Sequence, residues 1–376
     1  MNKLKNSLRL LVLITISTFV ISCGNRKNNK NDSGVTYSNP LDVKYGDPFI
    51  LKASDGKYYM YGTDGSAPGF KVYESQDLAA WKYVKMAYEG GKEDSWTKDS
   101  YWAPEVYERK GKYYMFFSAN WKYNPNNEEE VFRIGVAVSN TPTGPFKDLG
   151  DRPIFDPGYP IIDANVLFDD VHNKTYLYYS RCCYKHPVES EIADWAKDKG
   201  WYDEIEESWV YGVEMASDFS GVIGEPELLL RPPLKMNNVQ AEWESRSVTA
   251  RETNRRWTEG SYIFEHQDTY YMLYSANYFG GQYYAMGYAT SKNPLGPFKK
   301  AENNPILQKN NDQGGGVTGT GHGMVLDVAD SKKLCVYHAR TAETGNDRVV
   351  FMDELEILED GTLVVHGPKS GNVAVK

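Results

Sequence analysis

The sequence predicts an all-β protein, a five-bladed β-propeller, and three observations carry that prediction. A short aromatic and apolar segment recurs five times, each time after a turn rich in Asp, Gly, Asn or Lys. A second series of segments, in which apolar and polar residues alternate, contributes one segment after each of the first four aromatic segments. The 29 Tyr, 14 Phe and 9 Trp favour β-structure. Repeated units of three or four strands without helical periodicity between them are typical of propeller blades.

The aromatic segments are heptads whose starts lie 55, 62, 95 and 64 residues apart. They are Lys57–Thr63, Lys112–Ser118, Lys174–Ser180, Thr269–Ser275 and Lys333–Ala339. The second series comprises Lys71–Ser75, Gly135–Ser139, Gly212–Ser217 and Gly287–Ser291. A fourth, outer strand is expected from stretches such as Trp81–Met86 and Glu227–Leu230. A pair of β-sandwiches is the alternative all-β fold, but it would not produce five matching units.

The longest interval between heptads predicts an insertion at about residues 182–257. Its Ser190–Lys199 stretch favours a short helix, and the insertion also contains Trp195, Trp201, Trp209 and Trp243. Such a segment over one face of a propeller either shapes a substrate cleft or serves as a structural cover. The sequence leaves both open.

The N-terminus has the pattern of a bacterial lipoprotein signal. A positive start precedes an apolar run from Leu10 to Ile21, too short to span a bilayer, and Cys23 follows at the expected cut site. We expect residues 1–23 to be a signal peptide with Cys23 lipidated, although a plain secretory signal is the alternative. Residues 24–36 are expected to form a flexible tether and residues 37–376 the five-bladed propeller domain. The expected location is the cell envelope, through a lipid anchor.

The net charge of −9 and the absence of a basic stripe argue against nucleic acid as a partner. Beyond Cys23 the chain has three cysteines, of which two are adjacent, and no CxxC spacing. This pattern predicts neither a disulfide framework nor a zinc site.

A polar residue precedes four of the heptads at nearly equal distance. Asp47, Asp163, Glu259 and His322 lie 10, 11, 10 and 11 residues before the heptad that follows each of them. Equal offsets predict equivalent places at the start of the innermost strand of each blade. Those starts meet at the mouth of the central channel, so three carboxyl groups and one imidazole are expected to converge there.

Converging carboxyl groups cannot all ionise at their usual pKa values, so one is held protonated beside an ionised one. Glycoside hydrolysis is the reaction that uses such a pair most directly. Taken singly, each residue has an ordinary structural explanation, such as a turn before Pro48 or Gly260. Their coincidence at matched repeat positions favours a catalytic role.

These stretches resemble glycoside hydrolase family 43, the inverting arabinofuranosidases, xylosidases and arabinanases with a five-bladed propeller. The resemblance spans about residues 37–375. It rests on the ordered motifs Gly46-Asp47-Pro48-Phe49, Trp102-Ala103-Pro104-Glu105-Val106, Ile162-Asp163, Glu259-Gly260, Gly319-Thr320-Gly321-His322 and Tyr337-His338-Ala339-Arg340 leading to Arg348. Ala164 and Ser261 stand where the family often has proline.

The resemblance implies that Asp47 is the general base, Glu259 the general acid and Asp163 the group that tunes the pKa of Glu259. It further implies that Trp102 and Arg348 bind the sugar. His322 matches a central histidine that in many members helps to bind a calcium ion or ordered water in the channel, and it is expected among the substrate-binding residues as well. No cofactor is required, and a structural calcium ion is the one metal expected.

An inverting reaction would place the two catalytic carboxyl groups about 6.5–9.5 Å apart, whereas about 5 Å would indicate retention. The expected substrate is a plant-type polysaccharide or oligosaccharide with arabinofuranosyl or xylosyl linkages. Two alternatives stay open. One is another propeller glycosidase active on galactan or fructan, although the Asn-Asp-Pro-Asn-Gly start of the retaining fructan hydrolases is absent. The other is a non-catalytic glycan-binding lipoprotein.

Overall fold

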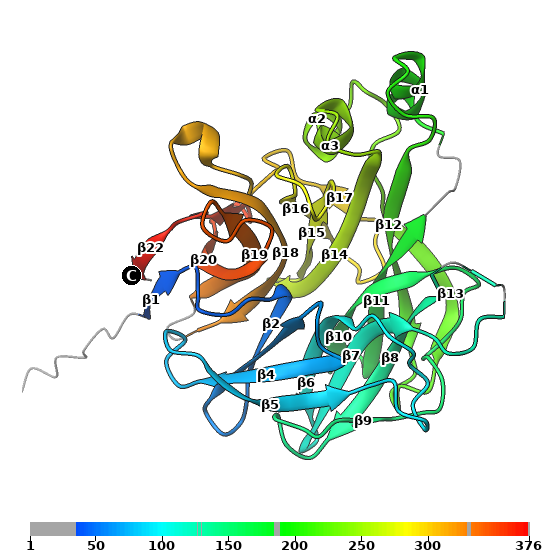
Figure 1. Cartoon of the computed structure of the whole chain (residues 1–376), viewed down its shortest axis with the longest axis vertical. Coiled ribbons are helices and arrows are strands. Elements are labelled where there is room, and N and C mark those ends of the chain that lie inside the picture. Colours follow the sequence, from blue (N-terminus) through cyan, green and yellow to red (C-terminus); the bar gives the residue numbers. More distant parts are fainter. Residues whose placement is uncertain (1–34, 126, 129, 184–188, 329–331, 375–376) are drawn as a thin grey trace, which may run out of the picture. The chain divides into compact units, whose positions relative to one another are not determined.

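Twenty of the strands form five consecutive antiparallel units of four strands, which are the five blades of a β-propeller (Figure 1), and the third and fourth units are joined into one sheet. The computed structural model describes residues 35–374 except 126, 129, 184–188 and 329–331. The proposed signal peptide with Cys23, and the tether up to residue 34, lie outside the described residues.

The blades follow one another along the chain. Blade 1 holds β2 (Gly46–Lys52), β3 (Tyr58–Thr63), β4 (Gly69–Ser75) and β5 (Lys82–Glu89). Blade 2 holds β6 (Trp102–Arg109), β7 (Lys112–Asn120), β8 (Phe132–Ser139) and β9 (Lys147–Asp148). Blade 3 holds β10 (Ile161–Asp169), β11 (Lys174–Cys183), β12 (Glu206–Met215) and β13 (Val222–Leu230). Blade 4 holds β14 (Arg255–His266), β15 (Thr269–Ala276), β16 (Ala285–Ser291) and β17 (Lys299–Lys300). Blade 5 holds β18 (Val317–Asp327), β19 (Lys333–Thr341), β20 (Val349–Ile357) and β21 (Leu363–Val365).

The first strand of each blade lies innermost. Strands β2, β6, β10, β14 and β18 contact one another in that cyclic order, and β18 returns to contact β2. This closed ring confirms the propeller and rules out the pair of sandwiches. All five aromatic heptads form the second strand of a blade, and the expected outer strands correspond to β5 and β13.

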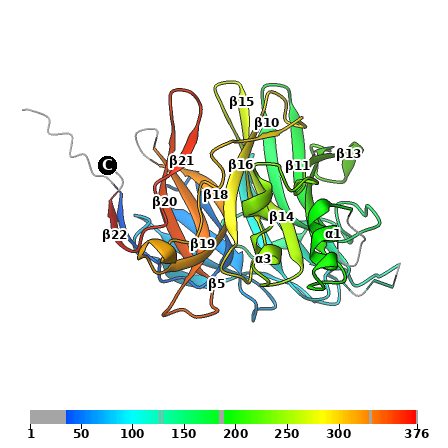
Figure 2. The same ribbon diagram turned by 90° about the horizontal axis from the view of Figure 1, so that it is seen from above.

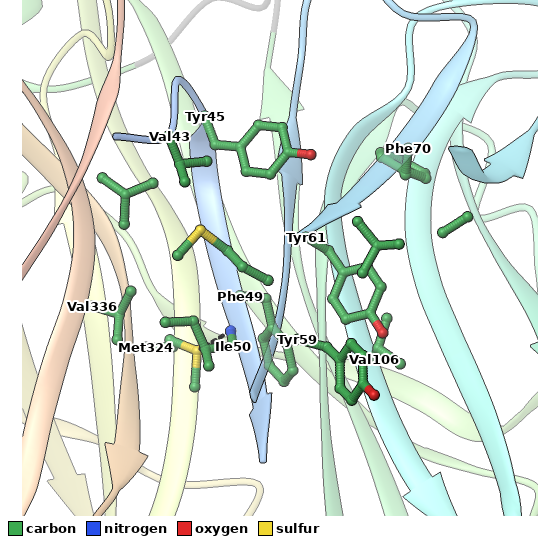
Figure 3. Close-up of a cluster of buried hydrophobic side chains, with 14 of the residues drawn as sticks. Val43, Tyr45, Phe49, Ile50, Tyr59, Tyr61, Phe70, Val106, Met324 and Val336 are labelled. Carbon is green, nitrogen blue, oxygen red and sulfur yellow. Dashed lines mark hydrogen bonds between the residues drawn. The ribbon is translucent and has the colours of Figure 1, made fainter. Parts of the chain in front are cut away.

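Buried apolar side chains from neighbouring blades fill the space between the sheets (Figure 3). Phe49 and Ile50 of β2 pack with Val106 of β6 on one side and with Met324 of β18 on the other. Each blade therefore buries apolar surface against two neighbours, which is how a propeller replaces one central core with several interfaces.

The two ends of the described chain close the ring. β1 (Thr36–Asn39) pairs antiparallel with β22 (Gly371–Ala374), and the two lie side by side at one edge (Figure 2). The Asn39 side chain donates to the Met352 carbonyl at 2.7 Å and accepts from the Met352 amide at 3.0 Å. Since Met352 lies on β20, the start of the chain is tied to the last blade before the first blade begins.

The predicted helix of the insertion is confirmed as α1 (Glu191–Asp198), capped by the Ser190 side chain. Two further short helices, α2 (Ala241–Glu244) and α3 (Arg246–Thr249), were not predicted. Figure 1 shows the three helices grouped beyond the ends of β12 and β14. There residues 206–208 of β12 pair parallel with 255–257 of β14, which joins blades 3 and 4.

A buried ion pair stabilises this junction. Arg256 and Glu207 are fully buried, and their Nη1 and Oε1 atoms lie 2.9 Å apart. The Arg256 guanidinium also donates to the hydroxyls of Ser245 and Ser190, so its hydrogen bonds connect the helices of the insertion to β14. The insertion is therefore part of the framework that supports the strand carrying Glu259.

Candidate active site

One cavity of about 280 Å³ brings together all six side chains that the sequence placed in the site. Its lining includes Asp47, Trp102, Asp163, Glu259, His322 and Arg348. They come from all five blades, so residues up to 301 positions apart in the chain meet there. The predicted convergence is confirmed.

A β-bulge at the same place in every innermost strand creates this arrangement. The pairing register shifts directly after Gly46, Trp102, Ile162, Glu259 and Gly321. The next residue has a positive φ in each case: Asp47 (51°), Ala103 (46°), Asp163 (60°), Gly260 (59°) and His322 (51°). A bulge redirects a side chain, and non-glycine residues with positive φ are strained conformations that concentrate at functional sites.

The register corrects one prediction. Asp47, Asp163 and His322 occupy equivalent positions, but Glu259 lies one residue earlier, and Gly260 takes the equivalent place in blade 4. The nearly equal distances from these residues to the following heptads concealed this difference, because the turns between the first and second strands differ in length. Two residues separate β14 from β15, whereas four separate β10 from β11. Glu259 therefore enters the cavity from a different point of its bulge than the two aspartates do.

A ring of hydrogen bonds links the five bulges. In every blade the backbone N–H of the positive-φ residue donates to a side chain at or near the end of the second strand of the preceding blade. The pairs are Ala103 to Thr63 (2.9 Å), Asp163 to Ser118 (3.0 Å), Gly260 to Ser180 (3.2 Å), His322 to Ser275 (2.7 Å) and Asp47 to His338 (3.1 Å). The acceptor is a hydroxyl in four blades and the Nδ1 atom of His338 in the fifth. This contact closes the ring between the last blade and the first.

Asp47 is held ionised. Its Oδ1 accepts from Arg348 Nη1 at 2.9 Å and lies 3.2 Å from His322 Nδ1, while its Oδ2 accepts from Thr63 Oγ1 at 2.6 Å. Burial alone would raise the pKa of Asp47, but Arg348 foremost, with the neighbouring imidazoles and the Thr63 hydroxyl, outweighs burial and holds the pKa well below its usual value.

Glu259 is held protonated. The side chain is 4% exposed, and burial first, then the nearby charge of Asp163, raises its pKa well above the usual value. Tyr284 donates a hydrogen bond to Oε1 at 2.9 Å, which leaves Oε2 to carry the acidic proton.

Asp163 lies beside Glu259, on β10, the innermost strand of the neighbouring blade 3. Its Oδ2 accepts from Ser180 Oγ at 2.9 Å and from the Gly260 N–H at 3.2 Å, directly after Glu259 in the chain. Burial raises the pKa of Asp163 too, while the nearby His322 and the hydrogen bonds from Ser180 and Gly260 act in the opposite direction and favour its charged form. In this coupled pair Asp163 loses its proton first, and its charge then keeps Glu259 protonated.

Two further predicted residues, Trp102 and Arg348, form part of the cavity wall. Trp102 stacks on Phe132 with ring centroids 4.1 Å apart, which fixes an indole face along the cavity. Arg348 reaches Asp47 across Gly46, where a Cβ would come within 1.9 Å of the guanidinium carbon. A side chain at position 46 would therefore displace the Arg348 guanidinium from its present place beside Asp47.

Sequence reasoning missed several residues of the site. Tyr284, Arg255, Trp257, Tyr278, Phe279 and Glu130 also line the cavity. Arg255 lies over the rings of Trp257 and Tyr278, and Arg348 lies over Phe279. These residues come from loops or strand ends outside the repeated pattern, so their positions gave no periodic signal. By contrast, Thr63 and the serines of the hydrogen-bond ring end the aromatic heptads and were visible there.

The residues around His322 do not form a metal site by themselves. Within the part of the chain that the structure describes, no group of three or more His, Cys, Asp or Glu side chains is arranged to hold an ion. Calcium prefers six to eight oxygen ligands, and the nearest carboxylate, Asp47, is already paired with Arg348. Calcium at His322 stays a prediction from the sequence, and no catalytic step below depends on it.

An ionised carboxylate and a protonated carboxyl group in one aromatic-walled cavity are the pair that hydrolysis of a glycosidic bond requires. The sequence profile of glycosyl hydrolases family 43 matches residues 37–363, and the chain belongs to that family.

The solved structure of a thermostable family-43 glycoside hydrolase is 34% identical, covers 89% of this chain and 97% of its own, and superposes with a TM-score of 0.74. A xylosidase/arabinosidase of Bacteroides ovatus is 26% identical over 65% of this chain and 73% of its own length. An extracellular endo-α-(1→5)-L-arabinanase of Thermotoga petrophila is 28% identical over 85% and 69%, respectively. The protein is thus a glycosidase, and the non-catalytic alternative is set aside.

Proposed function

We propose that this glycosidase removes α-L-arabinofuranosyl or β-D-xylosyl residues from plant polysaccharides or oligosaccharides by single-displacement inversion. Asp47 is the general base, Glu259 the general acid and Asp163 the residue that keeps Glu259 protonated. The observation that carries the proposal is the opposite protonation of Asp47 and Glu259 within one cavity. The related proteins named xylosidase/arabinosidase and arabinanase support the choice of sugars.

The base has the contacts that its role requires. Arg348, His322 and Thr63 engage Asp47 without using all of the roughly four lone-pair positions of a carboxylate, so a water molecule has an acceptor site left. These contacts also prevent rotation of the carboxylate. In the proposed reaction Asp47 takes a proton from that water while the oxygen attacks the anomeric carbon.

The acid acts on the other side of the scissile bond. Because Tyr284 donates to Oε1 of Glu259, the proton on Oε2 is the one available to the glycosidic oxygen. Glu259 gives up this proton as the bond to the leaving group breaks. The resulting carboxylate would be stabilised by the Tyr284 hydrogen bond, while the charge of Asp163 favours rapid reprotonation.

The size of the cavity supports exo action. At about 280 Å³ it lies just under the roughly 300–1,000 Å³ typical of pockets for drug-sized ligands, so it suits one sugar ring at the reaction centre. We propose that a terminal residue enters the cavity, with the rest of the chain outside.

The test combines a substrate screen with two acid variants. Purified protein is assayed on aryl arabinofuranosides, xylosides and galactosides and on plant polysaccharides, and the first-formed anomer is identified by NMR. Glu259→Gln is expected to abolish turnover of substrates with poor leaving groups, because it removes the proton donor, and to spare those with good leaving groups. Asp47→Asn is expected to abolish both. Wild-type activity of Glu259→Gln on natural linkages, or a product of retained configuration, would disprove the mechanism.

We also propose that the enzyme is anchored in the cell envelope by a lipid on Cys23. The support is the signal pattern of residues 1–23 alone. Among the described residues, no helix has the length and apolar character needed to cross a bilayer. A Cys23→Ala variant should move from the membrane fraction to the soluble fraction and lose incorporation of labelled fatty acid. Unchanged fractionation would refute the anchor.

A further inference from the structure

Glu130 contributes a fourth carboxyl group to the cavity, and the mechanism above does not use it. The residue lies in the hairpin between β7 and β8 of blade 2 and lines the same cavity as Asp47 and Glu259. Its Oε2 atom is buried, and it has no hydrogen-bond partner within the described residues.

An unpartnered buried carboxylate oxygen is costly. Leaving a buried acceptor unsatisfied costs about 1–3 kcal/mol, and more when the group is charged. Arg133, the buried cation of the adjoining strand, does not satisfy Glu130: its Nε binds Asp156 at 2.8 Å and its Nη1 lies 3.4 Å from Glu128. The cost is therefore not offset by the cation nearest to it in the chain.

Hydrogen bonds anchor the backbone of Val131 and Glu128, on either side of Glu130 in the chain. The next residue, Val131, donates its N–H to the Asn120 side chain at 3.1 Å and accepts from the Trp121 N–H at 3.1 Å. Two residues earlier, the Glu128 backbone is bound on both sides by the Asn124 side chain, at 2.7 and 2.9 Å. These contacts tie down the backbone near Glu130, which limits how far its carboxyl group can move from the cavity wall.

We infer that Glu130 binds a hydroxyl group of the sugar in the cavity and selects sugars that carry a hydroxyl there. The inference rests on the proposed function and deepens it. A carboxyl oxygen without a partner can accept a hydrogen bond, and the ring hydroxyls of a neutral sugar are the donors that a glycosidic substrate offers. A site built to bind a substrate hydroxyl discriminates strongly against an analogue that lacks it. With Asp47, Asp163 and Glu259 in the same cavity, a further acid also disfavours uronic acid residues.

The experiment compares wild type, Glu130→Gln and Glu130→Ala on the best aryl glycoside from the screen and on its series of monodeoxy analogues. With the parent glycoside we expect Glu130→Ala to lower kcat/KM by about 10- to 100-fold, the effect of losing one hydrogen bond to a charged group. With the one analogue that lacks the bound hydroxyl, wild type and variant should have equal kcat/KM. Glu130→Gln, which keeps one acceptor oxygen, should lie between them.

Glu128→Gln is the matched control. It changes an acid of the same hairpin that pairs with Arg133 and does not line the cavity. Its kcat/KM should stay within about threefold of wild type, and circular dichroism with thermal unfolding should confirm that all variants are folded. The inference is overturned if the Glu130→Ala loss is the same for every deoxy analogue, if Glu128→Gln reproduces it, or if Glu130→Ala retains activity within twofold.

Calorimetry separates failure of this inference from failure of the proposed function. If wild type hydrolyses no glycoside of the screen, the proposed substrates are wrong, and binding of free arabinose, xylose and galactose is measured instead. Weaker binding of one of these sugars to Glu130→Ala than to wild type and Glu128→Gln then supports the role of Glu130. Equal binding by all three proteins, or no binding by any, overturns it.

Discussion

Replacing Asp163 by Asn tests whether this carboxylate sets the protonation state of the general acid. Asn keeps the size of the side chain and an acceptor for Ser180 and the Gly260 N–H, but it removes the negative charge that faces Glu259. That charge is the second-largest cause, after burial, of the raised pKa of Glu259. A like charge within a few ångströms shifts a carboxyl pKa by about 1–3 units. The pKa of Glu259 should fall by at least about one unit.

The sign of the effect on activity follows from the role of Glu259. A general acid must be protonated, so kcat/KM is lost as the pH rises through its pKa. In Asp163→Asn the alkaline limb of the pH profile should therefore move to lower pH by at least about one unit. Unsubstituted phenyl glycosides are the suitable substrates, because their poor leaving group needs the acid.

Ser180→Ala is the matched comparison. It removes the hydrogen bonds to Asp163 and to the Gly260 N–H without removing the charge. Its activity should fall because the acid is less well placed, but the alkaline limb should not move to lower pH. If the limb of Asp163→Asn stays within about 0.3 unit of wild type while activity remains measurable, the assignment of Asp163 is wrong.

Two further predictions concern positions outside the acids themselves. Gly46→Ala should lower kcat/KM about 100-fold, because the added methyl group would lie 1.9 Å from the Arg348 guanidinium carbon and displace it from Asp47. Steady-state kinetics, with thermal unfolding as a control for folding, measure this loss. Near-normal kinetics would show that catalysis does not depend on the present position of Arg348. Arg256→Ala should lower the free energy of unfolding by up to about 3–5 kcal/mol, since it removes one of the two cations that pair with the fully buried Glu207 and leaves Arg231 as the other. Urea denaturation of the two proteins checks this value, and a loss below about 1 kcal/mol would contradict a structural role for the pair.

Much of the fold followed from repetition in the sequence. The aromatic heptads located the second strand of every blade because each is fully or largely buried on both faces, which selects the same residue types five times. The structure of the insertion could not be predicted from these repeats. Its short helices α2 and α3 are held by contacts with distant residues, such as the hydrogen bond from Arg256 to Ser245, and not by a periodic apolar face.

The residues of the site could be predicted from the sequence where they occupy positions that the blades repeat. Asp47, Asp163 and His322 sit on a repeated bulge, so their offsets carried information, whereas Glu259 was found despite standing one position away from it. Glu130 comes from a hairpin loop whose path depends on tertiary hydrogen bonds, and no sequence period marks it. Repeats thus predict what the blades share, and the residues that distinguish one substrate from another fall outside them.

The hydrogen bond between the Asp47 N–H and His338, which links the first blade to the last, affects the stage of folding at which the enzyme becomes active. Asp47 belongs to the first blade made during synthesis, yet Arg348 and His338, which fix its carboxylate and its backbone, come 301 and 291 residues later, in the last blade. A nascent or truncated chain with four finished blades carries both aspartates and Glu259, but Thr63 alone of the side chains that bind the Asp47 carboxylate is then in place. Hydrolytic competence should therefore arise only when the final blade docks, which makes turnover a direct readout of full-length assembly.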